Sequence, residues 1–317
     1  MMYEDFANAF MDELQSKIGD DAELKRTEFT KVNNVCLDGI SIRLLDSNVA
    51  PTIYLNDFYP LYKSGSTVSE LVEQAKKLVD KALIMKPAIP EFNLESAKEN
   101  LYGVLINRER NAGFLKNAIY EPLEDLAFVV RFKVGNEGSV LVTDELLTRF
   151  KLTSSEALEI AHKNTDKERF TCKSMGETVM ELLGERDISE DYMEGAYAEQ
   201  ENCPMYVITN ERKIDGAVAI SSDRVLKEAW EKIGGDYYIL PSSRHEVIAV
   251  PKTVTSDVNL LKSMVSEVNA TTVEKIDLLG NSIYLYNGRS LSRADSQKEI
   301  ITDIITAAKN RPHVMAH

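Results

Sequence analysis

The stretch that decides the fold is DGAVAISSDRVLKEAWEKIGGDYYILPSSRHEVIAVP, residues 215–251. Its apolar runs and periodicities predict a strand at 216–220, a helix from 223 to 233, and strands at 237–240 and 246–250. Gly234-Gly235 ends the helix, because glycine takes the left-handed backbone of a helix C-terminus without steric cost. Trp230 shares the apolar stripe of this helix, so we expect its side chain to be buried against the strands at 216–220 and 246–250.

The N-terminal part predicts a helix followed by a hairpin. Apolar residues recur every three or four positions from Tyr3 to Ile18, and Gly19 follows them. The runs 22–32 and 35–45 read as two strands, and Asn33-Asn34 between them tolerates the left-handed backbone of a tight turn. A short strand that runs into a helix or turn is expected at 51–62, and a helix from 68 to about 83.

Further along the chain, strands and helices both continue. Apolar runs predict strands at 126–134, 139–142, 205–209 and 282–286. Thr153 with Glu156, and Ser174 with Glu177, match the pattern in which a hydroxyl and a glutamate cap a helix start. Later helices are expected around 260–268 and around 300–305. Because strands occur both as hairpins and between helices, we predict an α+β fold of mostly antiparallel sheets flanked by amphipathic helices, in two lobes.

The prolines at 87 and 90 mark the boundary between the predicted lobes. Proline disfavours helix at its own position and at the preceding residue, so KPAIPEFN is a candidate linker. We therefore expect an N-terminal α/β-hairpin lobe at 1–90 and a C-terminal α+β lobe at 91–317. The segment 181–201 carries eight carboxylates and one arginine, which predicts a solvated acidic connection near 184–202.

Composition limits the classes of partner and the compartment. The net charge of −14 repels a phosphate backbone, and the basic clusters are short, so no nucleic-acid partner is expected. No apolar run approaches the roughly 20 residues that cross a bilayer, so no membrane association is expected either. The three cysteines are widely and irregularly spaced, as is typical of reduced thiols in a cytoplasmic protein. The ligand or partner, whether protein or small molecule, and the oligomeric state stay open.

The polar turn at 241–246 is the first candidate site. A hydrolase or transferase would use Ser243 as nucleophile, His245 as base and Arg244 beside them. In an extended chain Glu246 points away from His245, so an orienting acid would have to come from elsewhere, with Asp57 as one possibility. The alternative is a structural hairpin whose serines bond the backbone, and we favour this interpretation.

The aromatic corner at 50–59 is the second candidate. Rigid aromatic side chains with polar neighbours can form a recognition surface, and they can equally pack a turn. The ligand-binding candidates from this corner and from the turn are Tyr54, Asn56, Asp57, Tyr59, Ser242 and Glu246.

Cofactor and metal motifs are incomplete. His245-Glu246 begins a HExxH zinc pattern, but position 249 is alanine, and no cysteine pair has the spacing of metal ligands. His162 is expected to lie on an exposed helix face. Glycine-rich phosphate loops are absent from the sequence. We predict neither a metal nor a cofactor.

Four segments carry a resemblance to a known family: APTIYLNDFY (50–59), LINRERN (105–111), DLAFVV (125–130) and ILPSSRHEVIAVP (239–251). They resemble an uncharacterised bacterial family of domains of unknown function. The resemblance covers roughly residues 30–310 apart from 185–202, and it implies no activity.

Three functions follow as hypotheses. The leading one is a cytoplasmic, non-enzymatic binding or regulatory protein, because no catalytic or cofactor motif is complete. The second is a metal-independent hydrolase or transferase that uses Ser243, Arg244 and His245. The third is a structural or assembly protein.

Overall fold

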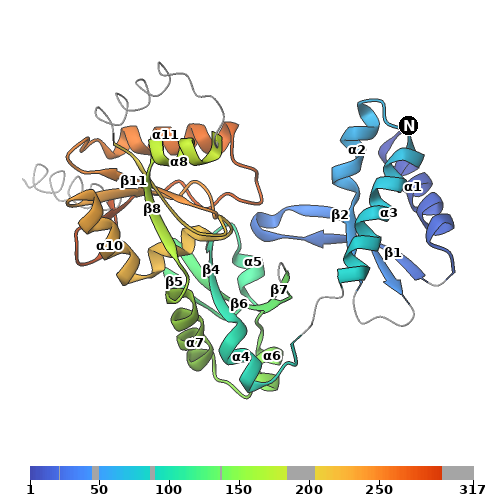
Figure 1. Cartoon of the computed structure of the whole chain (residues 1–317), viewed down its shortest axis with the longest axis horizontal. Helices are drawn as coiled ribbons and strands as arrows, with labels where there is room; N and C mark the ends of the chain where they lie inside the picture. Colours follow the sequence, from blue (N-terminus) through green and yellow to red (C-terminus); the bar gives the residue numbers. More distant parts are fainter. Residues whose placement is uncertain (21, 45–49, 86–89, 136–137, 184–203, 295–317) are drawn as a thin grey trace, which may run out of the picture. The chain divides into compact units, whose positions relative to one another are not determined.

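The computed structural model describes residues 1–20, 22–44, 50–85, 90–135, 138–183 and 204–294 (Figure 1). The chain forms two compact units. Unit 1 comprises Met1–Pro90 and Val134–Asn136, and unit 2 comprises Glu91–Lys133 and Glu137–His317. Each unit is described by itself. The candidate linker residues 86–89, the acidic connection predicted near 184–202 and the helix expected around 300–305 lie outside the described residues.

Unit 1 is a three-stranded antiparallel sheet with helices on one face (Figure 1). Its strands have the order β1-β2-β3, and α1 packs against both α3 and β1. The elements are α1 (Tyr3–Ile18), β1 (Ala22–Thr30), β2 (Cys36–Leu44), β3 (Thr52–Tyr54), α2 (Leu55–Lys63) and α3 (Val68–Met85). The core lies between the helices and the apolar face of the sheet, where Phe6, Phe10, Ile40 and Ile42 have no exposed surface.

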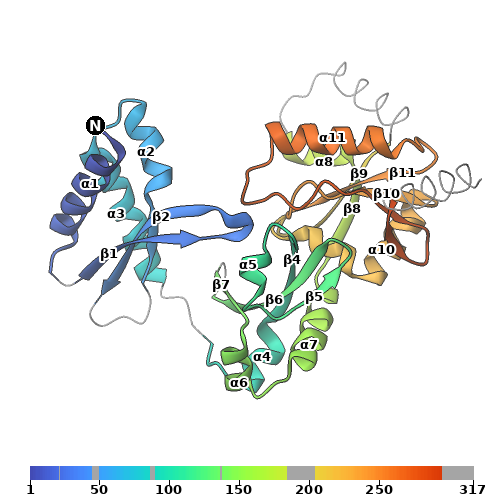
Figure 2. The same cartoon turned by 180° about the vertical axis from the view of Figure 1, so that it is seen from behind.

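The turn between β1 and β2 confirms the hairpin prediction. It is the short helical turn η1 (Val32–Asn34), in which Asn33 and Asn34 have φ angles of 60° and 56°. Asparagine tolerates this left-handed backbone better than most residues do. The strands pair from Ala22 opposite Leu44 to Thr30 opposite Cys36 without a bulge. The hairpin extends beyond the helices that cover the rest of the sheet (Figure 2).

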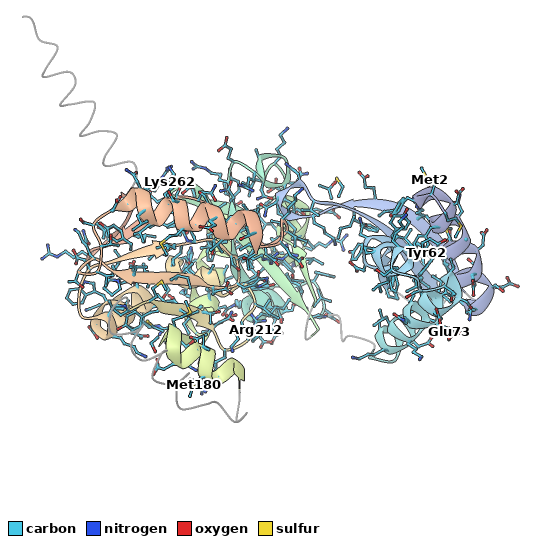
Figure 3. The ribbon with its side chains drawn as sticks, turned by 90° about the horizontal axis from the view of Figure 1, so that it is seen from above. Met2, Tyr62, Glu73, Met180, Arg212 and Lys262 are labelled. Atoms are coloured by element: carbon cyan, nitrogen blue, oxygen red, sulfur yellow. The ribbon has the colours of Figure 1, made fainter. Side chains whose placement is uncertain are left out.

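Unit 2 contains a six-stranded antiparallel sheet of order β13-β12-β10-β11-β9-β8. In Figure 1, α8 and α11 lie on one face of this sheet and α10 lies on the other; Figure 3 labels Met180 on α8 and Lys262 on α11. The elements are β8 (Phe170–Ser174), α8 (Met175–Leu183), β9 (Tyr206–Asn210), α10 (Asp223–Ile233), β10 (Tyr237–Leu240), β11 (Val247–Pro251), α11 (Val258–Thr271), β12 (Tyr284–Tyr286) and β13 (Leu291–Arg293). Both predicted capping pairs are present, before α7 (Ser154–Asp166) and before α8.

A second sheet of unit 2 has the order β4-β6-β5, with β7 also paired to β6. Its elements are α4 (Leu94–Asn100), β4 (Leu101–Asn107), α5 (Ala112–Leu115), β5 (Tyr120–Leu123), β6 (Leu126–Val134), β7 (Gly138–Leu141), α6 (Asp144–Phe150) and α7 (Ser154–Asp166). Asp125 joins the two sheets, because its carboxylate accepts hydrogen bonds from Ser282 Oγ at 2.8 Å and from Tyr284 Oη at 2.5 Å. Burial, followed by the charge of Asp125, raises the pKa of Tyr284, so the phenol stays protonated.

The prediction of a strand at 216–220 is wrong. The segment is a 3₁₀ helix, η2 (Gly216–Ser221), that packs against β9 and β4. Strands β8 and β11 already occupy both sides of β9, so no sheet edge is open beside it. Every residue from Gly216 to Ile220 is buried. A short, continuously apolar run fits a buried helix as well as a buried strand, and its sequence does not distinguish them.

The expectations for Trp230 and His162 also need correction. Trp230 is half-buried: its ring covers Gly288, and its Nε1 donates to Asp236 Oδ1 at 3.3 Å. The buried residues of α10 are Val225, Leu226 and Ala229. His162 is half-buried too, because its ring stacks on Phe128 at 4.0 Å and its Nε2 meets Glu121 Oε1 at 2.5 Å.

The observed sheets are antiparallel and flanked by helices, so the α+β prediction is confirmed. Over the part of the chain that the structure describes, no helix is both long and apolar enough to cross a membrane.

The close contact between Gly103 and Phe128 generates a stability prediction. A Cβ at position 103 would lie 2.0 Å from the Phe128 ring, which is fully buried under His162. We expect Gly103→Ala to lower the free energy of unfolding by about 3 kcal/mol, since a packed core cannot absorb such an overlap. The measurement is urea denaturation followed by fluorescence of Trp230, which reports on the same unit.

Gly113→Ala is the matched control. A Cβ there meets nothing within 4 Å, and we expect a change within about 0.5 kcal/mol. Equal midpoints for the two variants would contradict the packing of β4 on β6.

Candidate functional site

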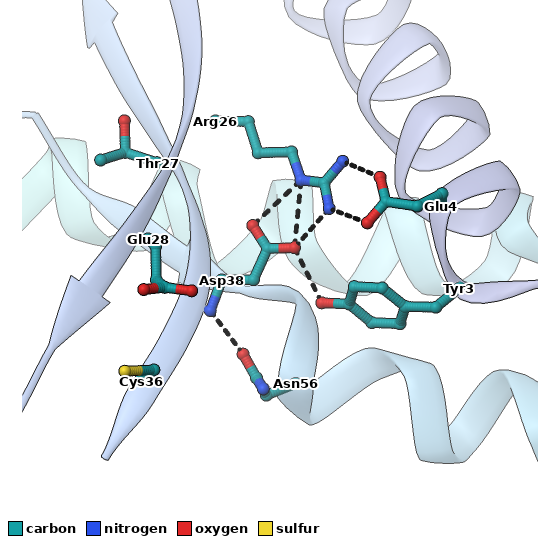
Figure 4. A pocket seen from close by; sticks show the side chains of 8 residues that line it. All are labelled: Tyr3, Glu4, Arg26, Thr27, Glu28, Cys36, Asp38 and Asn56. Atoms are coloured by element: carbon teal, nitrogen blue, oxygen red, sulfur yellow. Dashed lines mark hydrogen bonds and ion pairs between the residues drawn. The ribbon is translucent and has the colours of Figure 1, made fainter. Parts of the chain in front are cut away.

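Unit 1 carries an open pocket with a volume of about 610 Å³ (Figure 4). It lies where the N-termini of α1 and α2 meet the part of the hairpin that extends beyond the helices. Side chains from four elements line it: Tyr3 and Glu4 of α1, Arg26, Thr27 and Glu28 of β1, Cys36 and Asp38 of β2, and Asn56 of α2. The pocket thus depends on residues that are far apart in the sequence.

Arg26 is the centre of a hydrogen-bonded group in the pocket, which we call the Arg26 wall. It consists of Tyr3, Glu4, Arg26, Asp38 and Asn56. Its Nε donates to both carboxylate oxygens of Asp38 at 3.0 Å, and its Nη1 and Nη2 donate to the Glu4 carboxylate at 2.8 and 3.0 Å. Tyr3 Oη donates to Asp38 Oδ2 at 2.9 Å, and the Asp38 N–H donates to Asn56 Oδ1 at 2.8 Å. Paired bonds of this kind hold a guanidinium in one orientation, so the wall is rigid before any ligand arrives.

The ionisation states follow from these contacts. Hydrogen bonds from Arg26 hold the pKa values of Asp38 and Glu4 below their usual range, and the same bonds, donated to Asp38 and Glu4, raise the pKa of Arg26. Burial, with a smaller effect from the hydrogen bond to Asp38, raises the pKa of Tyr3 to about 12. At neutral pH the wall therefore holds one cation, two anions and a neutral phenol donor.

Glu28 adds a third carboxylate to the pocket. Three carboxylates against one guanidinium leave a net charge of −2 among the lining residues. In the described part of the chain the Glu28 side chain is exposed and has neither a hydrogen bond nor an ion pair. No histidine lines the pocket beside Cys36, so its thiol lacks the base that activates a cysteine nucleophile. The pocket is suited to binding a cationic group.

The predicted corner residues have separate environments. Asn56 lines the pocket, and Asp57 is an exposed residue in the first turn of α2. Tyr59 packs on the core of unit 1 against Tyr3 and Phe6. Tyr54 meets the ring of Phe29 edge-on at 5.9 Å, with the Lys31 Nζ 4.9 Å from its ring centre.

The polar turn at 241–246 connects β10 and β11 in unit 2. Ser243 has 6% of its surface exposed, and its Oγ accepts a hydrogen bond from the backbone N–H of His245 at 3.0 Å. Arg244 Nε donates to Asp215 Oδ1 at 2.6 Å. Among the described residues, no hydrogen bond joins the Ser243 hydroxyl to the imidazole of His245.

Both ring nitrogens of His245 have partners. Its Nδ1 accepts from the backbone N–H of Asp215 at 3.2 Å, and its Nε2 lies 3.1 Å from Asp277 Oδ1. An acceptor at Nδ1 places the proton of the neutral ring on Nε2, so the ring donates to Asp277. The acid beside this histidine is thus Asp277, which the sequence analysis missed because it lies 32 residues further along the chain.

Of the remaining candidates in the turn, Ser242 makes a backbone hydrogen bond and Glu246 has no partner among the described residues. The carbonyl of Ser242 accepts from the N–H of Leu279 at 3.0 Å, and Glu246 is half-buried. A smaller pocket of about 210 Å³ includes Thr209, whose hydroxyl donates to the carbonyl of His245 at 2.7 Å, but neither Ser243 nor His245 lines it. No group of three potential metal ligands occurs among the residues that the structure describes.

Comparison with known families matches the chain to a family of unknown function, DUF5688, over residues 3–288. The chain belongs to this family, as its signature segments predict. The match begins nearer the N-terminus than the resemblance in the sequence, and it includes the whole pocket of unit 1. The search of curated proteins found no match, and the search of solved structures found none.

The Arg26–Asp38 pair generates a pH prediction. The pKa of Asp38 is lowered from 3.8, so its charge stabilises the folded state above about pH 3.8, and this contribution is lost as the pH falls from there through the lower folded-state pKa. We expect Asp38→Asn to lower the stability of unit 1 by about 2 kcal/mol at pH 7, with the difference from wild type shrinking in that acid window. Urea titrations followed by amide resonances of β1 measure both quantities.

Asp12→Asn is the control, because Asp12 is exposed on α1, the helix that carries Tyr3 and Glu4, and has no ion pair in the described structure. It should leave the stability and its pH dependence unchanged. An Asp38→Asn variant as stable as wild type at pH 7 would contradict the importance of the Arg26 wall.

Proposed function

We propose that this protein is a cytoplasmic, non-enzymatic binding or regulatory protein, and that the pocket of unit 1 receives a cationic group of its ligand. The observation that carries the proposal is the net negative pocket built on the Arg26 wall. Two of its carboxylates are already paired with Arg26, and the third, Glu28, is exposed without a described partner. A ligand cation would pair with Glu28 and lower the net negative charge of the lining residues from −2 to −1.

The geometry favours a planar or small cation with hydrogen-bond donors. Glu28 offers two acceptor oxygens, and the outer lone pairs of the Glu4 carboxylate, which is largely exposed, add further acceptors. A guanidinium or ammonium group supplies only donors, so it matches these acceptors. An anionic ligand would face a net repulsive field, since the hydrogen bonds to Glu4 and Asp38 already neutralise Arg26.

The hydrogen bonds within the Arg26 wall lower the entropy cost of binding a ligand. Tyr3, Arg26 and Asp38 are held by mutual hydrogen bonds, so they lose little side-chain freedom when a ligand enters. Only the exposed Glu28 side chain has to be ordered.

The test compares acetyl-arginine amide with acetyl-citrulline amide, its neutral isostere. We expect the arginine compound to shift the amide resonances of Arg26, Glu28 and Asp38 in the full chain, and the citrulline compound to leave them in place. Glu28→Gln should weaken binding about 2- to 5-fold, in line with an exposed ion pair. Glu23→Gln is the matched control, because Glu23 is exposed on the same strand with its side chain on the opposite face. Equal shifts with both compounds would overturn the proposal.

A second candidate is a hydrolase or transferase at the polar turn, and the contact of His245 with Asp277 at 3.1 Å favours it. An imidazole oriented by a carboxylate is two thirds of a catalytic triad. Here, however, the Ser243 hydroxyl bonds a backbone N–H, and Asp215 occupies the second ring nitrogen. These bonds support a structural role for the turn.

Covalent labelling separates the two candidates. We expect a fluorophosphonate probe, which reacts with activated serines, to leave Ser243 unmodified in the native protein. Labelling of Ser243 that disappears in His245→Gln would instead favour the enzyme. Ser221→Ala, which removes another serine hydroxyl of unit 2, controls for labelling that is not specific to the turn.

A further inference from the structure

One edge of the unit 1 sheet is open along β1. The strand order β1-β2-β3 places β1 at an edge, and β1 is nine residues long. The N–H of Lys31 donates to the carbonyl of Val35, which continues the ladder and sets its phase. Because bonded pairs alternate in an antiparallel ladder, the odd-numbered residues of β1 bond to β2, and the even-numbered residues turn their N–H and C=O groups outward.

The outward backbone groups belong to Leu24, Arg26, Glu28 and Thr30. In the described part of the chain none of them has a backbone partner on that edge. The edge begins just after Ala22, whose carbonyl accepts from Gln15 Nε2 at 3.1 Å. Such a row of free donors and acceptors, spaced two residues apart, is a template for another extended chain.

Two of these even-numbered residues, Arg26 and Glu28, line the pocket. Side chains of alternate residues share one face of a strand, so Arg26 and Glu28 point to the side that Glu4 and Asp38 also occupy. Figure 4 shows the Arg26 and Asp38 side chains directed toward Glu4 and Tyr3 of α1. A chain paired with β1 would therefore place alternate side chains beside the pocket, with Cβ atoms about 5 Å from those of β1.

We propose that β1 takes up an extended segment of a partner protein as an added strand, with a lysine or arginine of that segment opposite Glu28. The backbone edge supplies affinity, and the charge of the pocket selects the side chain. The choice of a basic residue rests on the proposed function, whereas the choice of an extended segment rests on the free edge. A helical partner would leave the backbone groups of Arg26 and Glu28 unbonded, so only an extended chain uses both features.

Charge also sets what the edge rejects. An acidic side chain opposite Glu28 would lie among Glu28 and Glu4, and like charges directly across a ladder are destabilising. Exposed Lys25 and Glu23 face the other side of β1 and offer no equivalent pocket. The basic residue therefore has to lie on the pocket side of the added strand.

The test uses the full chain and a capped heptapeptide of alternating threonine and valine with arginine at its centre. Hydrogen exchange of the backbone amides is the readout. Without peptide, the amides of Leu24, Arg26 and Glu28 should exchange fast, and those of Lys25 and Thr27 slowly, because only the odd-numbered set pairs with β2. With saturating peptide, the even-numbered amides should slow about tenfold or more, while the odd-numbered ones stay as they are.

Two altered peptides separate backbone from side chain. For an added strand antiparallel to β1, N-methylation of the second and sixth residues blocks amides that would face β1, and should weaken binding about tenfold; methylation of the third and fifth should not. Citrulline in place of the arginine should weaken binding about 2- to 5-fold.

Each failure has its own signature. If acetyl-arginine amide binds the pocket but the peptide leaves the even-numbered amides unprotected, strand addition is overturned and the proposed function stands. If the citrulline peptide binds as tightly as the arginine peptide and protects the same amides, the strand edge stands and the cationic pocket is overturned. If the even-numbered amides are protected without peptide and lose protection on dilution, a second copy of the chain occupies the edge, and the proposal is overturned.

Discussion

The register of the β1–β2 hairpin is the constraint on which unit 1 depends. Side chains alternate along a strand, so a slip of one residue would move Leu24 and Ile40 into solvent and turn their polar neighbours toward the helices. The left-handed pair Asn33-Asn34 sets the turn, and burial of the apolar face sets the phase. The same alternation continues beyond the core, where this face of the sheet carries Arg26, Asp38 and the exposed Glu28. Core and pocket are thus two parts of one face of the sheet.

The way in which polar groups are satisfied distinguishes the two candidate sites. In unit 1 the Arg26 wall satisfies its own members and leaves Glu28 available. In unit 2 the polar residues of the 241–246 turn bond neighbouring segments of the same chain. Arg244 pairs with Asp215, and the His245 ring contacts both Asp215 and Asp277. These bonds anchor η2 and the segment before β12 to the six-stranded sheet. Side chains that are reactive in other settings here hold three chain segments together.

The elements with strong local patterns could be predicted from the sequence. Apolar periodicity located α1 and α10, the asparagine pair located the hairpin turn, and the two capping pairs located the starts of α7 and α8. Local patterns did not distinguish η2 from a strand, because its five buried apolar residues carry no periodicity. The candidate sites were harder still. Asn56 was predicted as a site residue because of its aromatic neighbours, yet its contribution is to accept a hydrogen bond from the backbone N–H of Asp38. Tyr59 of the same cluster packs against the core.

The sequence by itself determined the α+β class, the family and the positions of most helices and strands, because these follow from periodicity, turn residues and short signatures that act within a few residues. Only the tertiary structure decided which polar residues meet. Tyr3, Glu4 and Arg26 lie 35, 34 and 12 residues from Asp38, and Asp215 and Asp277 lie 30 and 32 residues from His245. Contacts over such separations follow from strand pairing and helix packing, which depend on the burial of the whole apolar face and leave no local mark in the chain.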